Sequence, residues 1–131
     1  MIDIRPHIYD TITGDTAITA LVDQEVHIFQ DGKDVREGYE DKWPQITYGR
    51  YAPARVNRIW VRVEFFQISS WAKTLTDAEA ISREVIRVFN RKDNDVCRSC
   101  TLSSVDDTYD PETKSFWVHT RFTFVIYDPD Y

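Results

Sequence analysis

Apolar residues at regular spacing predict a helix at the start of the chain. Between Asp3 and Thr13 an isoleucine recurs at every fourth position, as it does along one face of a helix: Ile4, Ile8 and Ile12. Asp3 is the expected N-cap of this helix. Pro6 falls in the first turn, where its missing N–H breaks no hydrogen bond.

A second short helix is predicted directly after the first. Gly14 is expected to end the first helix, and Asp15 is placed to cap a helix from Thr16 to Val22. We expect the apolar side chains of this helix to face the core: Ile18, Leu21 and Val22.

A short strand and a long loop are predicted next. Residues 25–30 alternate between two faces, as a strand does. Residues 31–43 have dense mixed charge, two glycines and no periodicity, so we expect an exposed loop. Loops of this length inside a compact domain are often functional. Contact with a neighbouring molecule is the expected role, and disorder before assembly is the alternative.

Two further strands are predicted between Gln45 and Trp71. The first covers Gln45–Tyr51 with Gly49 as a candidate bulge, and residues 52–58 are expected to connect it to the second. The second strand, Ile59–Trp71, has one aliphatic and aromatic face, formed by Ile59, Val61, Val63 and Phe65. Its other face is mixed: Trp60, Arg62, Glu64 and Phe66. We therefore expect the apolar face on the core and the mixed face to be available.

An amphipathic helix is predicted from Thr76 to about Arg91. Thr76 and Glu79 have the spacing of a capping box. One stripe of the helix is apolar and suits docking on a sheet: Ala78, Ile81, Val85, Val88 and Phe89. A second stripe is basic, namely Arg83, Arg87 and Arg91, and Glu79 is placed to pair with Arg83.

The last third of the chain is predicted to be a β-hairpin. Its strands are Cys100–Asp107 and Ser115–Tyr127, and the turn chemistry of Asp110 before Pro111 lies between them. Alternate residues of the last strand are apolar: Phe116, Val118, Phe122, Phe124 and Ile126. The predicted fold is α+β, a single domain over residues 1–131. An antiparallel or mixed sheet of about five strands packs against two main helices, in the order α-β-β-β-α-β-β.

Composition narrows the possible functions. The chain carries a net charge of −6 and has a pI near 5.0, whereas proteins that grip nucleic acid usually have a basic surplus. Tight or sequence-specific DNA binding is therefore not expected. The sequence shows no signal peptide and no apolar stretch of the ~18 residues that a membrane span needs. We expect a cytosolic protein without membrane contact.

The two cysteines, Cys97 and Cys100, have C-x-x-C spacing. A zinc site needs about four ligands, and the sequence has no second such pair and no spaced histidine pair. The redox version of the motif begins a helix, whereas this segment has the pattern of a strand. Both cysteines are therefore interpreted as structural thiols.

No catalytic motif stands out. His7, His27 and His119 are scattered, and no G-x-S-x-G or phosphate-binding glycine loop occurs. An acidic cluster around the hairpin turn could hold a metal, but a solvated turn explains it better: Asp106, Asp107, Asp110 and Glu112. We expect no catalytic, cofactor-binding or metal-binding residues, and no enzyme activity.

A local basic patch interrupts the acidic chain. No acidic residue occurs between Lys42 and Glu64, and this stretch contains Arg50, Arg55, Arg58 and Arg62. The patch could face DNA or an acidic patch on another subunit, or simply be a solvated surface. Arginine forks match carboxylates, which favours subunit pairing over DNA contact.

The order of elements and several local strings resemble the tail-terminator or tail-completion (head-tail joining) proteins of tailed bacteriophages. The resemblance covers nearly the whole chain. The matching strings are Ile2–Pro6, Ala17–Val22, Trp43–Tyr48, Phe66–Ala72, Thr76–Ala80 and Tyr109–Thr113. The most telling is Gln67-Ile-Ser-Ser-Trp71 before a helix that carries Ala78-Glu-Ala80. Loop 31–43 and segment 52–58 depart from the family pattern.

The resemblance implies a structural virion protein that caps the tail tube as a ring, expected to be a hexamer, and forms the head-tail joining interface. Implied partners are other copies of itself, the major tail tube protein, the head-completion or connector protein, and genomic DNA that passes through the lumen without specific binding. The implied location is the virion neck, and the host cytoplasm during assembly. The alternatives are another neck or connector component and a small nucleic-acid-binding module. A closed ring needs two different patches on each subunit. Candidate interface residues are Tyr39, Trp43, Arg50, Arg55, Arg58, Trp60, Arg62, Phe66, Arg83, Arg87 and Arg91.

Overall fold

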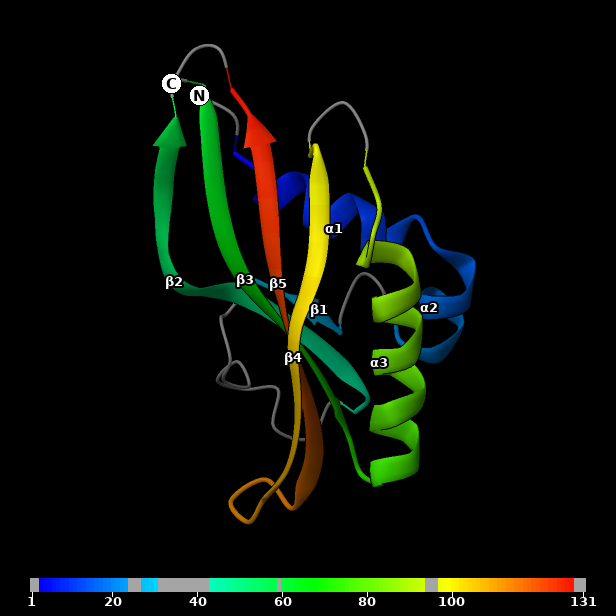
Figure 1. Cartoon of the computed structure of the whole chain (residues 1–131). Coiled ribbons are helices and arrows are strands. Elements are labelled where there is room, and N and C mark those ends of the chain that lie inside the picture. Colours follow the sequence, from blue (N-terminus) through cyan, green and yellow to red (C-terminus); the bar gives the residue numbers. More distant parts are fainter. Residues whose placement is uncertain (1–2, 24–26, 31–42, 59, 94–96, 129–131) are drawn as a thin grey trace.

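The described part of the chain forms one five-stranded sheet with three helices on one of its faces (Figure 1). This computed structural model describes residues 3–23, 27–30, 43–58, 60–93 and 97–128. The helices are α1 (Arg5–Thr13), α2 (Thr16–Leu21) and α3 (Leu75–Phe89). The strands are β1 (Ile28–Phe29), β2 (Gln45–Arg58), β3 (Val61–Ala72), β4 (Ser99–Asp110) and β5 (Ser115–Tyr127).

The sheet has the strand order β1-β2-β3-β5-β4. The four long strands pair antiparallel with their neighbours, while the short β1 pairs parallel with β2. The prediction of an α+β fold with an antiparallel or mixed five-stranded sheet is confirmed. Strand β4 therefore forms one edge of the sheet. Strand β2 forms most of the other edge, because β1 pairs only with Ile46 and Thr47.

The two N-terminal helices begin and end nearly where the sequence predicts. Asp15 caps α2 by accepting a hydrogen bond from the Ile18 N–H at 3.0 Å, as predicted. The predicted N-cap of α1 is wrong: Ile4 is the N-cap, and Asp3 accepts from the Arg5 N–H instead. Leu21 is also misplaced by the prediction, because it is 39% exposed rather than buried.

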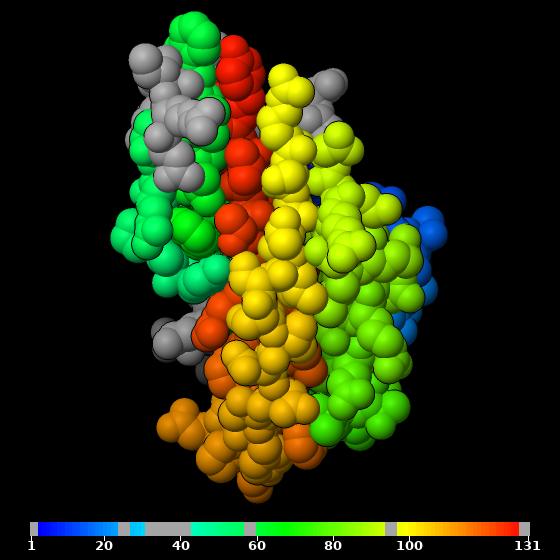
Figure 2. Space-filling view, in the orientation of Figure 1, coloured from blue at the N-terminus to red at the C-terminus, as the bar shows by residue number. Residues whose placement is uncertain are grey.

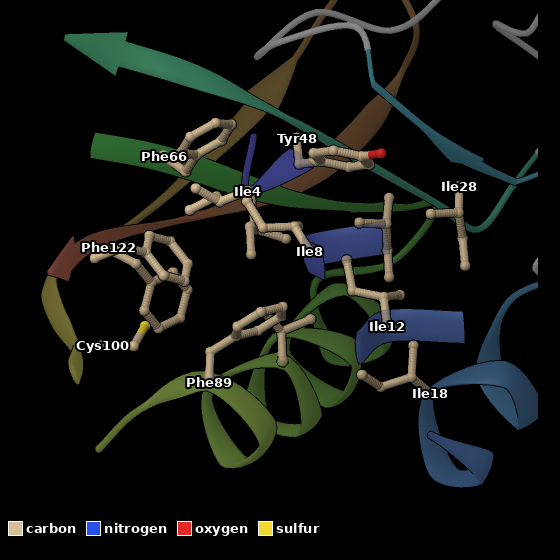
Figure 3. Close-up of a cluster of buried hydrophobic side chains, with 14 of the residues drawn as sticks. Ile4, Ile8, Ile12, Ile18, Ile28, Tyr48, Phe66, Phe89, Cys100 and Phe122 are labelled. Carbon is tan, nitrogen blue, oxygen red and sulfur yellow. The ribbon is translucent and has the colours of Figure 1, made fainter. Parts of the chain in front are cut away.

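The hydrophobic core lies between the sheet and the helices. Isoleucines of α1 and α2 pack against Phe89 of α3 and against the rings that the sheet directs toward the helices (Figure 3). On β5 this face holds the predicted apolar series, and it is buried at Val118, Phe122, Phe124 and Ile126. Phe122 and Phe124 are both in contact with Phe89.

The core-facing side of β3 is the opposite of the one predicted. Phe66 and Ile68 belong to the core cluster, so the predicted mixed face is the one under the helices. Arg62 and Glu64 lie on that face and are 2% and 1% exposed. They can be buried because each has a charged partner, and one of these partners lies far away in the sequence.

Strand β2 is longer than predicted. Residues 52–58 are not a connection but continue the strand, with register shifts against β3 around Ala52 and Val56. Gly49 is not a bulge, because it pairs regularly with Gln67. The predicted strand at 25–30 is described only from residue 27, where Ile28 and Phe29 pair with β2; the predicted loop 31–43 lies outside the described residues except for Trp43.

Helix α3 begins earlier and ends earlier than predicted. Thr74, not Thr76, is the N-cap, and its hydroxyl accepts from the Asp77 N–H at 3.2 Å. The helix ends at Phe89. Arg91 then turns back with φ 60° and donates its N–H to the Cys100 carbonyl at 2.8 Å.

The hairpin is confirmed, with β4 extending to Asp110 rather than ending at Asp107. The side chain of Asp110 accepts hydrogen bonds from the Glu112 N–H and the Thr113 hydroxyl, each at 3.0 Å, which fixes the turn. Figure 2 shows β4 running along the molecule between β5 and α3.

Candidate assembly surfaces

The described residues contain no group of three or more His, Cys, Asp or Glu side chains that could hold a metal ion. Cys97 and Cys100 are thiols in no disulfide and are 2% and 3% exposed. Burial raises the pKa of both thiols, which favours their protonated form. The Cys97 thiol donates to the Ser99 carbonyl at 2.8 Å. Both cysteines therefore have the geometry of core residues.

A buried polar network lies on the helix-free face of β3 and β5, and the sequence did not point to it. The Ser69 hydroxyl lies 2.5 Å from Nδ1 of His119, and the Gln67 amide nitrogen lies 3.0 Å from the same atom. Arg121 donates from Nε to the Gln67 amide oxygen at 2.9 Å. The only sequence signal was the alternation of Gln67 and Ser69 with Phe66 and Ile68.

Ser69 and His119 have the atoms of a nucleophile and its base, but their location does not suit catalysis. Ser69 is 0% exposed and His119 is 4% exposed, so a substrate has no access to either. The ring of His119 packs edge-on against Trp117, whose own ring stacks on Trp71 at 4.9 Å. Trp71 donates from Nε1 to the Thr47 hydroxyl at 3.0 Å. The network ties β2, β3 and β5 together.

The predicted arginine patch is divided by the structure. Arg62 donates to Glu64 at 3.0 Å and to Asp128 at 2.7 Å, and all three side chains are at most 3% exposed. Arg50 binds the same Glu64 through Nε and Nη2, each at 2.8 Å, but it is 52% exposed. Because Arg62 is committed inside the chain, it contributes no free surface charge.

Arg55 is the freer member of the patch. Its guanidinium lies over the ring of Phe65, 5.6 Å from the centroid, on the helix-free face, and its side chain is exposed. The side chain of Arg58 lies outside the described residues. Arg50 on the helix face and Arg55 on the helix-free face are thus the two described, exposed charges of this edge.

Trp60 projects from the end of the sheet where β2 turns into β3. It has a positive φ of 69°, is 46% exposed, and packs edge-on against Tyr127. Arg98 lies over the other aromatic of this pair, 5.5 Å from the Tyr127 ring centroid. Phe66, which the sequence groups with Trp60, is fully buried in the core.

The three arginines of the basic stripe are exposed, and Arg87 is held in ion pairs. Arg87 donates to Glu84 at 2.6 Å and to Asp15 at 2.7 Å, which links α3 to the cap of α2 and lowers the pKa of Asp15. The predicted Glu79–Arg83 ion pair is not found among the described residues, and Arg83 and Arg91 are exposed.

Trp43 lies against the polar network rather than in open solvent. Its ring is tilted on Trp71 with centroids 6.3 Å apart, and Lys73 lies 5.0 Å from its centroid. Tyr39 lies outside the described residues. Trp43 is therefore half-buried within its own chain.

A groove runs between α3 and the outer edge of β4. Its volume is about 450 Å³, and its lining mixes both charges with apolar side chains: Glu79, Ser82, Arg83, Ile86, Val105, Asp106, Asp107 and Val118. Val105 is 48% exposed. Among the described residues, this groove brings together an edge strand, the unpaired Arg83 and two carboxylates of β4, of which Asp106 lies 3.5 Å from Nη1 of Arg121.

The fold is a small α+β domain whose exposed candidate residues lie along the sheet, at its end and on or just after α3, whereas Arg62 and Phe66 are buried. The chain belongs to the family described as tail completion protein gp17, whose profile matches residues 6–127. The resemblance drawn from the sequence is therefore confirmed.

The fold is also shared with a known structure. A chain from the structure titled "Virion of native gene transfer agent (GTA) particle" is similar with a TM-score of 0.67 and 12% sequence identity. The match covers 91% of this chain and 90% of that one. No curated protein sequence matches the chain. No helix among the described residues has the length and apolarity needed to cross a bilayer.

Proposed function

We propose that this protein is a structural virion component that caps the phage tail tube as a ring, ends tail polymerisation and forms part of the head-tail joint. The observation that carries the proposal is the family match over residues 6–127, which begins in the first turn of α1 and reaches the end of β5. A hexamer is the ring size we propose. Its partners are then other copies of this chain, the major tail tube protein and the head-completion or connector protein.

The surface chemistry supports an assembly role over an enzymatic one. The described residues hold no metal-binding cluster, and the Ser69–His119 pair is closed to substrate. Exposed aromatics such as Trp60 and Tyr109, at 46% and 49%, are residue types that anchor protein interfaces. The protein acts by binding, and no step of bond making is needed.

The alternative of a nucleic-acid-binding module loses support from the ion pairs. Of the four arginines in the patch, Arg62 is neutralised inside the chain and Arg50 is already bound to Glu64. The net charge of −6 remains unfavourable for phosphate contact. DNA therefore passes through the ring without being held. The protein acts in the neck of the virion after assembly in the host cytoplasm.

Size-exclusion chromatography with light scattering, combined with negative-stain imaging, tests the proposal. The purified protein should form rings alone or on the ends of purified tail tubes, and hosts infected with phage that lack the protein should accumulate tubes of uncontrolled length. A protein that stays monomeric both alone and with tubes, and that binds DNA in a salt-sensitive way, would overturn the proposal in favour of the module.

A further inference from the structure

The two edges of the sheet differ in charge, and both have unpaired backbone in the described part of the chain. Strand β2 has no outer partner there beyond Thr47, and its exposed stretch carries Arg50 and Arg55. Strand β4 is exposed along most of its length, and its C-terminal half, next to the β4–β5 turn, carries three carboxylates: Asp106, Asp107 and Asp110. Unpaired edge strands are templates for pairing with another chain.

The strand directions suit a repeat of this chain beside itself. Strands β2, β3, β5 and β4 alternate in direction, so β2 and β4 run opposite to each other. If a second copy is placed next to the first by a rotation about an axis along the strands, β4 of one copy meets β2 of the other in antiparallel orientation. The sheet then continues without a break in its pattern.

We propose that neighbouring subunits join by adding β2 of one copy to β4 of the next, with the helices on the outer side, so that the sheets form one continuous barrel-like wall. This inference rests on the proposed ring function and names its subunit contact. The contact is heterologous, because two different edges meet, which is the kind of contact that closes into a ring.

The register of this contact follows from the geometry of closed sheets. In an eight-stranded barrel with a shear of eight, the stagger amounts to about one residue per strand. Four long strands per subunit therefore displace the neighbour by about four residues. Closed barrels have a fixed hand of strand tilt, and the helices are on the outside. Each β2 residue therefore meets a residue of the neighbour's β4 that is about four positions nearer the β4–β5 turn.

This displacement brings opposite charges together. Within one subunit Arg50 pairs with Phe66, and Phe66 pairs with Phe122. Val118 lies four residues before Phe122 on β5, on the side of the β4–β5 turn, and pairs with Asp107. Arg50 of one subunit thus meets Asp107 of the next, and both side chains lie on the helix face. Glu64 holds Arg50 by Nε and Nη2, which leaves Nη1 free to donate to that second carboxylate.

The helix-free face has its own charge pair in the same register. Within one subunit Ala52 pairs with Phe65, and Phe65 pairs with Thr123. His119 lies four residues before Thr123 on β5 and pairs with Asp106. Ala52 therefore lies opposite Asp106 of the next subunit. Within its own subunit, one carboxylate oxygen of Asp106 lies 3.5 Å from Nη1 of Arg121. Arg55 of the neighbouring subunit is on the same face and lies diagonally across from Asp106, where its long side chain can reach the other oxygen of that carboxylate.

Two features keep these edges from pairing indiscriminately. Pro53 has no N–H, and β2 shifts register on both sides of it, so only a matched partner strand fits. At the start of β4 the edge is already used, because Cys100 accepts from Arg91 and the Leu102 N–H donates to Asn90. The free part of β4 is the half that carries the carboxylates and borders the groove beside α3.

Disulfide trapping tests the contact and its register. Ala52→Cys combined with Asp106→Cys should link neighbouring subunits of the oxidised ring into a ladder of covalent multimers on non-reducing gels. The two positions cannot bridge within one subunit, because three strand spacings, about 14 Å, separate β2 from β4, and a disulfide needs Cα atoms within about 7 Å. The native Cys97 and Cys100 are buried, and the wild-type protein serves as their control.

The matched control is Ala52→Cys with Thr101→Cys. Thr101 is exposed and lies on the same face of β4, level with Ala52 in the unstaggered sheet. It should give no ladder. Rings that show no ladder with Asp106→Cys, or a ladder only with Thr101→Cys, would overturn the proposed contact while leaving the ring function intact. A protein that forms no oligomer alone or on tubes would overturn both.

A charge swap gives an independent readout. Arg55→Glu or Asp106→Lys alone should raise the concentration needed for ring formation about tenfold or more, and the two together should restore it. Glu112→Lys, on the exposed hairpin turn away from the contact, should leave assembly unchanged. If the double variant assembles no better than either single variant, the charge pairing is overturned.

Discussion

The two faces of the sheet are both buried over much of their length, but by different means. The helix face is closed by aliphatic and aromatic side chains, such as Phe122 against Phe89 of α3. The helix-free face is held by hydrogen bonds among Gln67, Ser69 and His119, next to stacked indoles. A close-packed apolar core is destabilised when side-chain volume is removed, whereas a buried polar network is destabilised when one member loses its hydrogen-bond partner. The helix face should therefore carry most of the stability, and the helix-free face should fix the register of the strands.

The largest expected effect is on the helix face. Phe122→Ala should lower the free energy of unfolding by about 3–5 kcal/mol, because it removes a fully buried ring and leaves a cavity between β5 and α3. Urea denaturation followed by circular dichroism measures the change. Thr123→Val, on the same strand but on the other face, is the control. It removes one exposed hydrogen bond, between the Thr123 and Ser103 hydroxyls at 2.9 Å, and should cost no more than about 1 kcal/mol. Equal losses in both variants would contradict the division between the faces.

The second effect concerns the polar network. Ser69→Ala should cost about 1–3 kcal/mol, because the Nδ1 atom of His119 and the Gln67 amide lose a buried partner while the volume hardly changes. The same denaturation experiment measures it. A loss as large as that of Phe122→Ala would mean that the two faces contribute alike.

The third effect is a pH dependence that originates on the helix face. Burial raises the pKa of Tyr48 to about 12, above its usual value of 10.0. Between these values the unfolded chain loses the phenolic proton while the folded chain keeps it. Stability should therefore fall above pH 10 by at most about 1.4 kcal/mol per pH unit, until the folded form also ionises near pH 12. Denaturation at pH 9 and pH 11 should show this drop in the wild type, and Tyr48→Phe should reduce it.

The smallest effect is at the start of the helix that covers the core. Thr74→Ala removes the hydroxyl that caps α3 and should cost about 1 kcal/mol. Thr76→Ala, two residues later, tests the alternative cap and should cost less. If Thr76→Ala is the more damaging of the two, the cap assignment is wrong. Thermal denaturation distinguishes the two variants.

Local patterns in the sequence predicted the elements whose causes are local. The Asp15 cap, the apolar stripe of α3 and the alternation of β5 all depend on residues a few positions apart, and the structure contains each of them. The cap of α3 was placed two residues late because Thr74 and Thr76 each have an acidic residue three positions on. Spacing alone does not show which of these two threonines caps the helix.

The errors arose where distant residues decide the outcome. The core face of β3 was misjudged because Arg62 and Glu64 look like surface residues, and Arg62 is neutralised by Asp128, 66 positions away. Segment 52–58 looked like a connection because Pro53 and polar residues hide a strand that β3 holds in place. Of the candidate interface residues, Arg62 and Phe66 were assigned to the surface for the same reason, and both are buried.

The four tryptophans divide into two environments, which has a practical consequence for spectroscopy. Trp71 is buried, and its ring stacks on Trp117 and also contacts the tilted ring of Trp43. Trp60, at the far end of the sheet, is 46% exposed. Fluorescence from the wild type therefore mixes a shielded cluster with one water-exposed emitter. Replacing Trp60 by Phe would leave a signal that reports only on the fold. The difference between the two spectra would then isolate the light from that end of the molecule, giving an optical probe of whatever covers it during assembly.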